Sequence, residues 1–226
     1  MLVLALDTST ESVVAGLLEV PATGEPTVLA TELRAGARQH GEQLMPAILD
    51  AARAAGRRLD ELDAVVCGAG PGPFTGLRVG LVSAAGLGDA LAVPVYGVCS
   101  LDAIAHRAGP GEPLLVVSDA RRREVYWAAY DAAGHRVHGP AVLAPSALAQ
   151  RLGELGSRRV AGPVAGGYAE LFGLPEQGSG LAPTPAGLVA AALVQLRSGA
   201  EPGPLEPLYL RRPDAVPPGE RKRVSA

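Results

Sequence analysis

Two aspartates in this sequence have surroundings that could support chemistry. Asp7 ends a short apolar run and is followed by Thr8, and Asp119 ends a second apolar run near the middle of the chain. A carboxylate at the end of a buried strand can face a magnesium ion in a nucleotide-handling fold, but such a residue more often accepts hydrogen bonds from its own turn. Asp7, Thr8 and Asp119 are therefore candidates for a cofactor-binding site, with a purely structural role as the alternative.

A glycine-rich stretch is the second place where chemistry could occur. Residues 68–78 read GAGPGPFTGLR and lie between an apolar run at 63–67 and a long apolar segment at 77–93. A loop of this kind between a strand and a helix can hold a phosphate, because free N–H groups at a helix start favour an anion. The loop has neither the Lys-Ser/Thr pair of a P-loop nor the GxGxxG spacing of a dinucleotide site, and its prolines remove donors. A phosphate site is not favoured here.

The other reactive residues do not combine into a recognisable site. No Ser-His-Asp or Cys-His set has a known spacing. Cys67 and Cys99 form no CxxC or zinc pattern, and Asp102 and His106 read as an exposed pair on one helix. We predict no catalytic residue and no metal site in this chain.

Composition indicates a globular protein. The 226 residues are 48% hydrophobic, which is enough for one large or two small domains, and the formal net charge of −3 gives no general attraction to nucleic acid. The first residues lack the basic region of a signal peptide, and Arg78 and Asp89 interrupt the most apolar segment before it reaches membrane length. The sequence predicts a cytoplasmic protein with no membrane contact.

The order of apolar runs predicts an α/β fold. In the first half, strands are expected at residues 2–6, 13–20, 27–34, 63–67 and 93–98, with helices at 39–55 and 77–93. In the second half, strands are expected at residues 114–119, 125–130 and 159–161, with helices at 101–107, 147–155 and 185–197.

The second half also repeats the pattern that opens the first. Asp7 and Asp119 each follow a buried strand, and each is followed by a five-residue turn and another apolar strand. This repeat predicts a duplicated hairpin domain. We expect an N-terminal domain at residues 1–108 that carries the partner interface, and a smaller C-terminal domain at residues 109–226 whose last segment packs back on the first.

The helix expected at 77–93 carries a ridge of small residues that recur every fourth position. A glycine inside a helix costs about 1 kcal/mol relative to alanine, and close approach of another helix can offset that loss. The approaching helix is either the chain's own first helix or one from another molecule. If another molecule supplies that helix, the partner interface would consist of His40, Leu44, Ile48, Gly76, Gly80, Ala84 and Gly88.

Four stretches resemble the TsaB (YeaZ) family. Residues 70–80 read GPGPFTGLRVG and match the family's GPGSFTGLRIG signature, with Pro73 in place of serine. The other matches lie at residues 4–10, 119–126 and 207–211, so the resemblance covers nearly the whole chain. The glycine loop is shared with the related TsaD proteins, whereas the chain length and the block at residue 119 favour TsaB.

The resemblance implies an actin/hexokinase/Hsp70-like (ASKHA) architecture of two tandem ribonuclease-H-like domains. It also implies a role in forming N6-threonylcarbamoyladenosine at position 37 of tRNAs that read ANN codons. In that pathway TsaD transfers the threonylcarbamoyl group with a metal held by an HxxxH motif, TsaB is its non-catalytic partner, and the ATPase TsaE joins them. ATP, the metal and the tRNA are therefore expected to belong to the complex and not to this chain alone.

The metal-binding histidines of TsaD correspond here to Gly97 and Leu101, neither of which can bind a metal. Our first hypothesis is a scaffold, a pseudo-enzyme that binds TsaD through its N-terminal helices and forms a homodimer when alone. The alternative hypothesis is an ATP-binding or ATP-hydrolysing enzyme of the same fold that uses Asp7 and Asp119.

Overall fold

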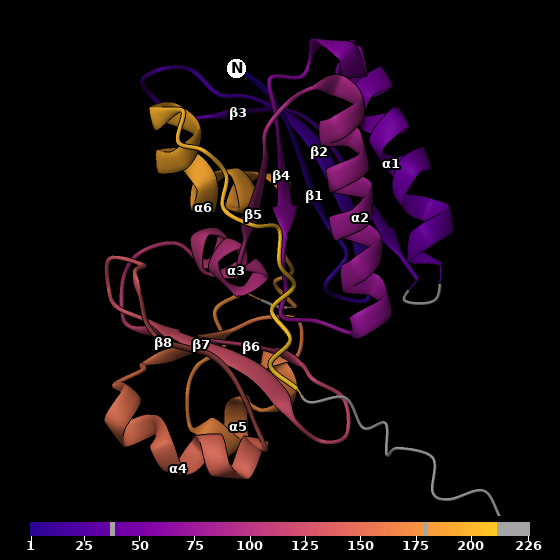
Figure 1. The fold of residues 1–226 in the computed structure, drawn as a ribbon. Helices are drawn as coiled ribbons and strands as arrows, with labels where there is room; N and C mark the ends of the chain where they lie inside the picture. Colours follow the sequence, from indigo (N-terminus) through magenta and orange to yellow (C-terminus); the bar gives the residue numbers. More distant parts are fainter. Residues whose placement is uncertain (37–38, 179, 212–226) are drawn as a thin grey trace, which may run out of the picture.

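Two β-sheets, one above the other, organise the structure (Figure 1). The structure is a computed structural model and describes residues 1–36, 39–178 and 180–211. Between the sheets lie two helices that pack against each other, α3 (Ser100–Ala108) and α6 (Pro185–Ser198). In the described part of the chain, no helix combines the length and the apolar character needed to cross a bilayer.

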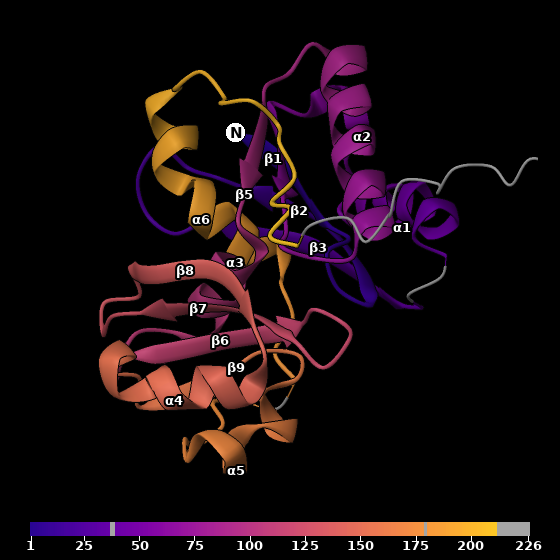
Figure 2. The ribbon, with the colours of Figure 1, turned by 60° about the horizontal axis from the view of Figure 1, so that its bottom comes forward.

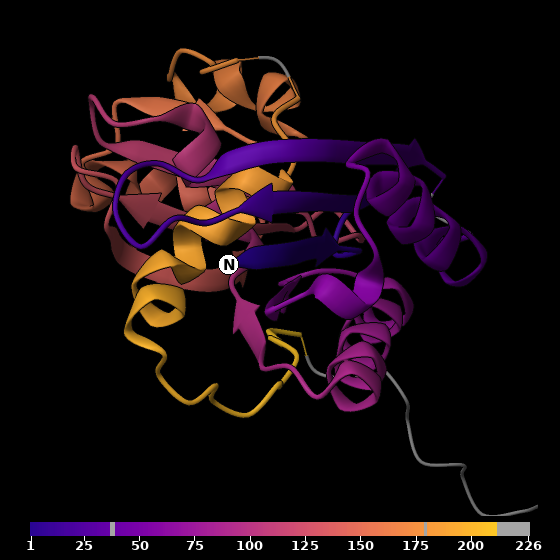
Figure 3. The same ribbon diagram turned by 90° about the horizontal axis from the view of Figure 1, so that it is seen from above.

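The first sheet has five strands in the order β3-β2-β1-β4-β5. β1 is antiparallel to β2 and parallel to β4, and β5 is parallel to β4. The strands are β1 (Leu2–Asp7), β2 (Ser12–Glu19), β3 (Thr27–Ala35), β4 (Ala64–Gly68) and β5 (Val95–Val98). The helices α1 (His40–Ala54) and α2 (Phe74–Leu91) cover one face, and α6 covers the other (Figure 1 and Figure 3).

Strand alternation explains why both faces of this sheet are buried. Leu4 and Leu6 of β1 pack with α1 and α2, whereas Val3 and Ala5 point to the opposite face and pack with α6. Successive side chains of a strand point to opposite faces, so a strand that is apolar at every position needs a cover on both sides.

The second sheet has four strands in the order β8-β7-β6-β9. The strands are β6 (Leu114–Asp119), β7 (Val125–Tyr130), β8 (Arg136–Leu143) and β9 (Arg159–Ala161). α3 packs on one face, and α4 (Pro145–Leu155) and α5 (Ala169–Phe172) pack on the other. The short 3-10 helices η1 (Leu59–Glu61) and η2 (Ala165–Gly167) complete the described structure.

The two sheets begin with the same arrangement, which confirms the predicted repeat and the α/β class. In each, a central strand (β1 or β6) has an antiparallel hairpin partner on one side and a parallel strand on the other. The boundary between residues 108 and 109 stays a prediction, and its second part includes residues 212–226, outside the described chain. β8 was not predicted, because its residues are exposed or half-buried and include Gly139 and Pro140.

The small-residue ridge of α2 lies inside the molecule, against the first sheet. A Cβ at Gly80 would overlap Oγ1 of Thr8, and a Cβ at Gly88 would overlap the side chain of Val95. Ala84 is fully buried in the same core. The ridge therefore packs within the chain, mainly on the first sheet.

The predicted partner interface needs a correction for this reason. The glycines of α2 allow close packing inside the molecule, so they do not lie on its surface. The residues expected beside them on α1 belong to the same core. All seven are buried: His40, Leu44, Ile48, Gly76, Gly80, Ala84 and Gly88. The spacing correctly identified one face of each helix, but that face is covered by the chain itself.

Replacing two glycines of α2, one inside the ridge and one outside it, should change the stability of the protein in opposite directions. Gly80→Ala adds a Cβ where Thr8 leaves no room, so we expect the free energy of unfolding to fall by about 2 kcal/mol. At Gly86 an added Cβ meets no atom within 4 Å, so Gly86→Ala, the matched control, should raise it by about 1 kcal/mol. Urea unfolding followed by circular dichroism measures both changes, and equal effects would show that the ridge is not packed.

Candidate functional site

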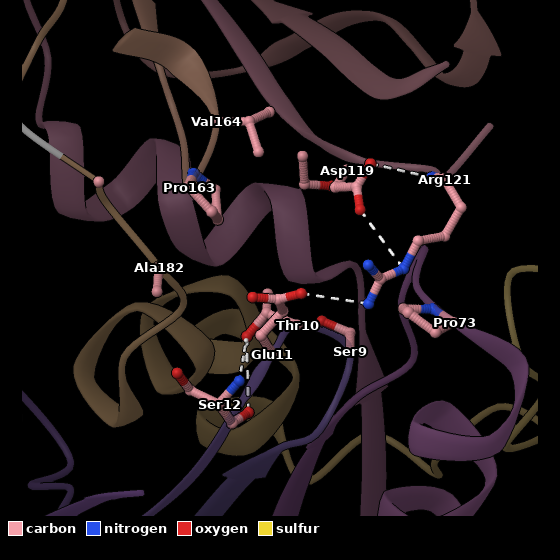
Figure 4. Close-up of a pocket in the computed structure, with 12 residues that line it drawn as sticks. Ser9, Thr10, Glu11, Ser12, Pro73, Asp119, Arg121, Pro163, Val164 and Ala182 are labelled. Carbon is pink, nitrogen blue, oxygen red and sulfur yellow. Dashed lines mark hydrogen bonds and ion pairs between the residues drawn. The ribbon is translucent and has the colours of Figure 1, made fainter. Parts of the chain in front are cut away.

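A cleft of about 300 Å³ opens between the two sheets, where β1 and β6 end (Figure 4). Hydroxyl and charged groups from both halves line it. Its wall is formed by the β1–β2 turn, by Pro73, and by the end of β6 with Arg121. Pro163 and Val164, which follow β9, and Ala182, which precedes α6, complete it.

Asp7 does not reach this cleft. Its side chain is fully buried, and Oδ1 accepts hydrogen bonds from the backbone N–H and the hydroxyl of Ser9, both at 2.7 Å. Oδ2 accepts the hydroxyl of Ser100 at 2.5 Å. A Cβ at position 68 would overlap Oδ2, so glycine is needed there. The carboxylate thus joins β1, β4 and the start of α3.

The environment of Asp7 favours its neutral form. Burial raises the pKa of the carboxyl above its ordinary value, because desolvation disfavours the charge, and the hydrogen bonds from Ser100 and Ser9 offset part of this effect. Thr8 is also used internally, since its Oγ1 donates to the carbonyl of Gly76 at 2.7 Å. Two of the three candidate cofactor residues therefore lie behind the cleft wall.

Asp119 is the candidate that lines the cleft. Its Oδ1 accepts the N–H of Arg121 at 2.9 Å, and Nε of Arg121 lies 3.4 Å from Oδ2. Nη2 of the same arginine lies 3.1 Å from Oε1 of Glu11, which follows the β1 strand (Figure 4). Arg121 therefore links the two halves across the cleft. Glu11 could not be found from sequence, because it lies 110 positions away from the arginine.

The turn that contains Arg121 has an unusual backbone. Arg121, Arg122 and Arg123 have φ values of 61°, 50° and 62°, in the left-handed region. For residues with a side chain this conformation costs about 1–2 kcal/mol each. The turn is closed by the N–H of Ala120, which donates to the carbonyl of Glu124 at 3.1 Å. Strain of this kind persists where the surrounding structure holds it, often at functional sites.

The C-terminal segment at residues 205–211 connects the two halves (Figure 2). The N–H of Leu208 donates to the carbonyl of Ala69 in the first half at 2.9 Å, and Arg211 donates to the carbonyl of Ala120 in the second at 3.0 Å. The side chain of Leu205 lies 3.1 Å from where a Cβ of Gly97 would be. The segment therefore fills the space in front of β5.

α1 and α2 carry an exposed apolar face beside their buried one. A shallow groove of about 470 Å³ runs between them, lined by Gly41, Phe74, Thr75, Arg78, Val79, Val82 and Ser83. Val82 is 70% exposed, and Leu49 of α1 is 46% exposed. Phe74 stacks on Tyr209 with ring centres 5.3 Å apart, and the Arg78 guanidinium lies 3.9 Å from the centre of the Phe74 ring.

The remaining reactive groups are used internally. Burial raises the pKa of the Cys99 thiol to about 12, so it stays protonated. Asp102 accepts the hydroxyl of Tyr130 at 2.8 Å and Arg136 at 3.2 Å, and it holds α3 against the second sheet. Among the described residues, no three His, Cys, Asp or Glu side chains are grouped so that they could hold a metal ion.

The buried Asp7 predicts a pH-dependent stability. The pKa of Asp7 in the folded protein lies above its ordinary value of 3.8. Its favourable contribution to the free energy of unfolding is therefore present below pH 3.8 and is lost as the pH rises through the pKa of the folded state. We expect the wild type to lose stability relative to Asp7→Asn as the pH rises from about 4 to 7. Urea unfolding at a series of pH values measures this difference.

Asp131→Asn is the matched control for this experiment. Hydrogen bonds from the backbone of His135 and Ala133 lower the pKa of the Asp131 carboxyl, so its stabilising contribution is lost as the pH falls. The difference between wild type and Asp131→Asn should therefore change with the opposite sign. A pH-independent difference for Asp7→Asn would contradict the raised pKa.

The sequence of this chain is similar to those of several known proteins. The family model of TsaD, tRNA N6-adenosine threonylcarbamoyltransferase, matches residues 34–196. An uncharacterized protein of Mycobacterium tuberculosis is 49% identical over 215 residues, which cover 95% of this chain and 94% of that protein. The tRNA threonylcarbamoyladenosine biosynthesis protein TsaB of Escherichia coli is 33% identical over 162 residues, which cover 69% of this chain and 68% of that protein.

The fold agrees with the sequence relationships. The solved structure of YeaZ from Pseudomonas aeruginosa superposes with a TM-score of 0.74 at 31% identity and covers 92% of this chain and 99% of that one. The two sheets, with α3 and α6 between them, have the actin/hexokinase/Hsp70-like (ASKHA) architecture. Sequence and fold together show that the chain belongs to the TsaB (YeaZ) branch of the family that the TsaD model describes.

Proposed function

We propose that this chain is a non-catalytic subunit needed to form N6-threonylcarbamoyladenosine at position 37 of ANN-decoding tRNAs. The observation that carries the proposal is its kinship with the Escherichia coli protein whose name assigns it to threonylcarbamoyladenosine biosynthesis. In this proposal the chain works in the cytoplasm, binds the catalytic subunit TsaD together with the ATPase TsaE, and meets tRNA within that complex.

A supporting role is consistent with the two residues of this chain that correspond to the metal-binding histidines of TsaD. Gly97 and Leu101 have no ligand atoms in their side chains. Leu101 is buried, and Leu205 packs in front of Gly97. In the proposal, the metal and ATP are held by the partner subunits.

The alternative, an ATP-using enzyme, requires Asp7 and Asp119 to face the same cleft. Asp119 lines the cleft, but both oxygens of Asp7 accept hydrogen bonds inside the core. This arrangement favours the supporting subunit. Calorimetry of the isolated chain with ATP and magnesium tests the alternative directly.

The proposed contact with TsaD is the exposed apolar face of α1 and α2. Exposed apolar patches on a folded protein often mark protein–protein contacts, and here Phe74, Val82 and Leu49 supply the area. Without TsaD, the same face would pair with a second copy of this chain, which gives a homodimer.

Introducing one charge into the proposed partner face should weaken binding to TsaD. Val82→Glu would place an unpaired carboxylate in the contact, so we expect binding to TsaD to weaken about tenfold or more, with little change in melting temperature. Val194→Glu is the matched control, because Val194 is 82% exposed but lies on α6, on the other side of the first sheet. Gel filtration and calorimetry measure both, and undiminished binding of Val82→Glu would exclude this face.

The proposed function predicts a chemical change in tRNA. Deleting the gene should remove threonylcarbamoyladenosine from digested tRNA, as measured by liquid chromatography and mass spectrometry, and the wild-type gene should restore it. In a reconstituted reaction with TsaD and TsaE, omitting this chain should abolish product. Full modification without the chain would refute the proposal.

A further inference from the structure

We propose that the cleft between the two sheets is a binding site for a small neutral molecule that carries the vicinal diol of a ribose ring. The site goes beyond the supporting role proposed above, which makes no use of the cleft. The observation that points to a ligand is a buried hydroxyl group in the cleft wall, that of Ser118, for which the described part of the chain offers no hydrogen-bond partner.

Ser118 lies near the end of β6, and its side chain is directed toward the cleft. Val116, two residues earlier, packs with α3, whereas Val117 packs with α4 and α5 on the opposite face. Strand alternation therefore turns Ser118 toward α3 and the first sheet. Only 6% of Ser118 is exposed, and this residue lines the cleft. A buried hydroxyl without a partner is costly, so we infer that its partner comes from outside the chain.

The two carboxylates of the cleft can accept more hydrogen bonds than they do. Arg121 contacts each oxygen of Asp119 once and only Oε1 of Glu11. An ionised carboxylate has about four lone-pair sites, so both side chains can accept further donors while these ion pairs stay intact. Two adjacent hydroxyls of a ligand can donate to the carboxylates while a third group pairs with Ser118.

The charges of the cleft favour a neutral ligand. Glu11 and Asp119 outnumber the single guanidinium of Arg121, so a phosphate or carboxylate group would be repelled. A cation would have to compete with Arg121, which already contacts both carboxylates. A neutral polyhydroxylated molecule needs neither charge nor the loss of an ion pair.

The shape of the cleft is suited to one sugar ring. Pro163, Val164 and Ala182 form an apolar side across from Asp119 and Arg121 (Figure 4). A sugar has hydroxyls at its edge and C–H groups on its face, so it can use both sides. The volume of about 300 Å³ is at the lower end of the range for small-molecule sites, about 300–1,000 Å³. The diol can come from a free pentose or from the ribose of a nucleoside.

The test is an NMR titration of the full chain with D-ribose and adenosine, each compared with its 2-deoxy analogue. The deoxy compounds should bind about tenfold more weakly, because they lack one hydroxyl of the diol. Equal affinity for ribose and adenosine would identify the free sugar as the ligand, and tighter binding of adenosine would identify a nucleoside. If neither compound binds at about 10 mM, the site is overturned.

ATP with magnesium tests the preference for a neutral ligand. Its phosphates would approach the carboxylates of Glu11 and Asp119, so it should bind no more tightly than adenosine. Tighter binding of ATP would show that phosphate is recognised, which would overturn the proposed ligand class.

Ser118→Ala separates a role in binding from a role in folding. The variant should bind the preferred diol about tenfold more weakly. Its melting temperature without ligand should stay the same or rise, because the hydroxyl has no partner in the described chain. A lower melting temperature with unchanged binding would show that Ser118 is structural and would overturn the site.

Ser157→Ala is the matched control. Ser157 is also 6% exposed, and its hydroxyl also has no hydrogen-bond partner, but it does not line the cleft. This variant should bind the diol like the wild type. An equal loss of binding in both variants would mean that the effect is not specific to the cleft, which would overturn the site.

The outcomes are independent of those that test the proposed function. If the gene is needed for threonylcarbamoyladenosine but the chain binds neither diol, the site is overturned and the function stands. Diol binding that depends on Ser118, in a chain that proves unnecessary for the modification, would retain the site and refute the function.

Discussion

One buried side chain, the carboxyl group of Asp7, joins the elements around the cleft. Burying an ionisable group is costly unless hydrogen bonds compensate, and here Ser9 and Ser100 provide them. Because Gly68 leaves room for the carboxylate, the end of β1, the end of β4 and the start of α3 converge on it. The cleft wall and the helix that supports the second sheet both follow from this junction. Asp7 therefore organises the site without being part of its surface.

Local patterns allowed most of the fold to be predicted, because strand alternation and the repeated Asp turn are local signals. β8 was missed, since an exposed edge strand with Gly139 and Pro140 has little apolar pattern. The small-residue ridge shows the limit of periodicity. A spacing of four identifies one face of a helix, but whether the chain itself or another molecule covers that face depends on tertiary packing. The link between Glu11 and Arg121 likewise exists only once the two halves meet.

Two separate surfaces are found on the described chain, the cleft between the sheets and the apolar groove between α1 and α2. The cleft is lined by Asp119 but not by Asp7, whose carboxyl is buried, and its two sides are linked by the ion pairs of Arg121 with Asp119 and Glu11. The apolar surface lies elsewhere, on α1 and α2, where Val82 and Phe74 are open to solvent. Both surfaces are consistent with the supporting role proposed above.

The position of α6 has a consequence for synthesis on the ribosome. This helix covers one face of β1, β2, β4 and β5 in the first sheet, although it is encoded after the entire second sheet. Until residues 185–198 leave the exit tunnel, the nascent chain exposes Val3, Ala5 and Val66, which α6 later buries. Such long-range closure is slow and leaves apolar surface open to aggregation. The strands of the first sheet are all made by residue 98, but burial of this face must wait for nearly the last part of the chain, and chaperones can act during that interval.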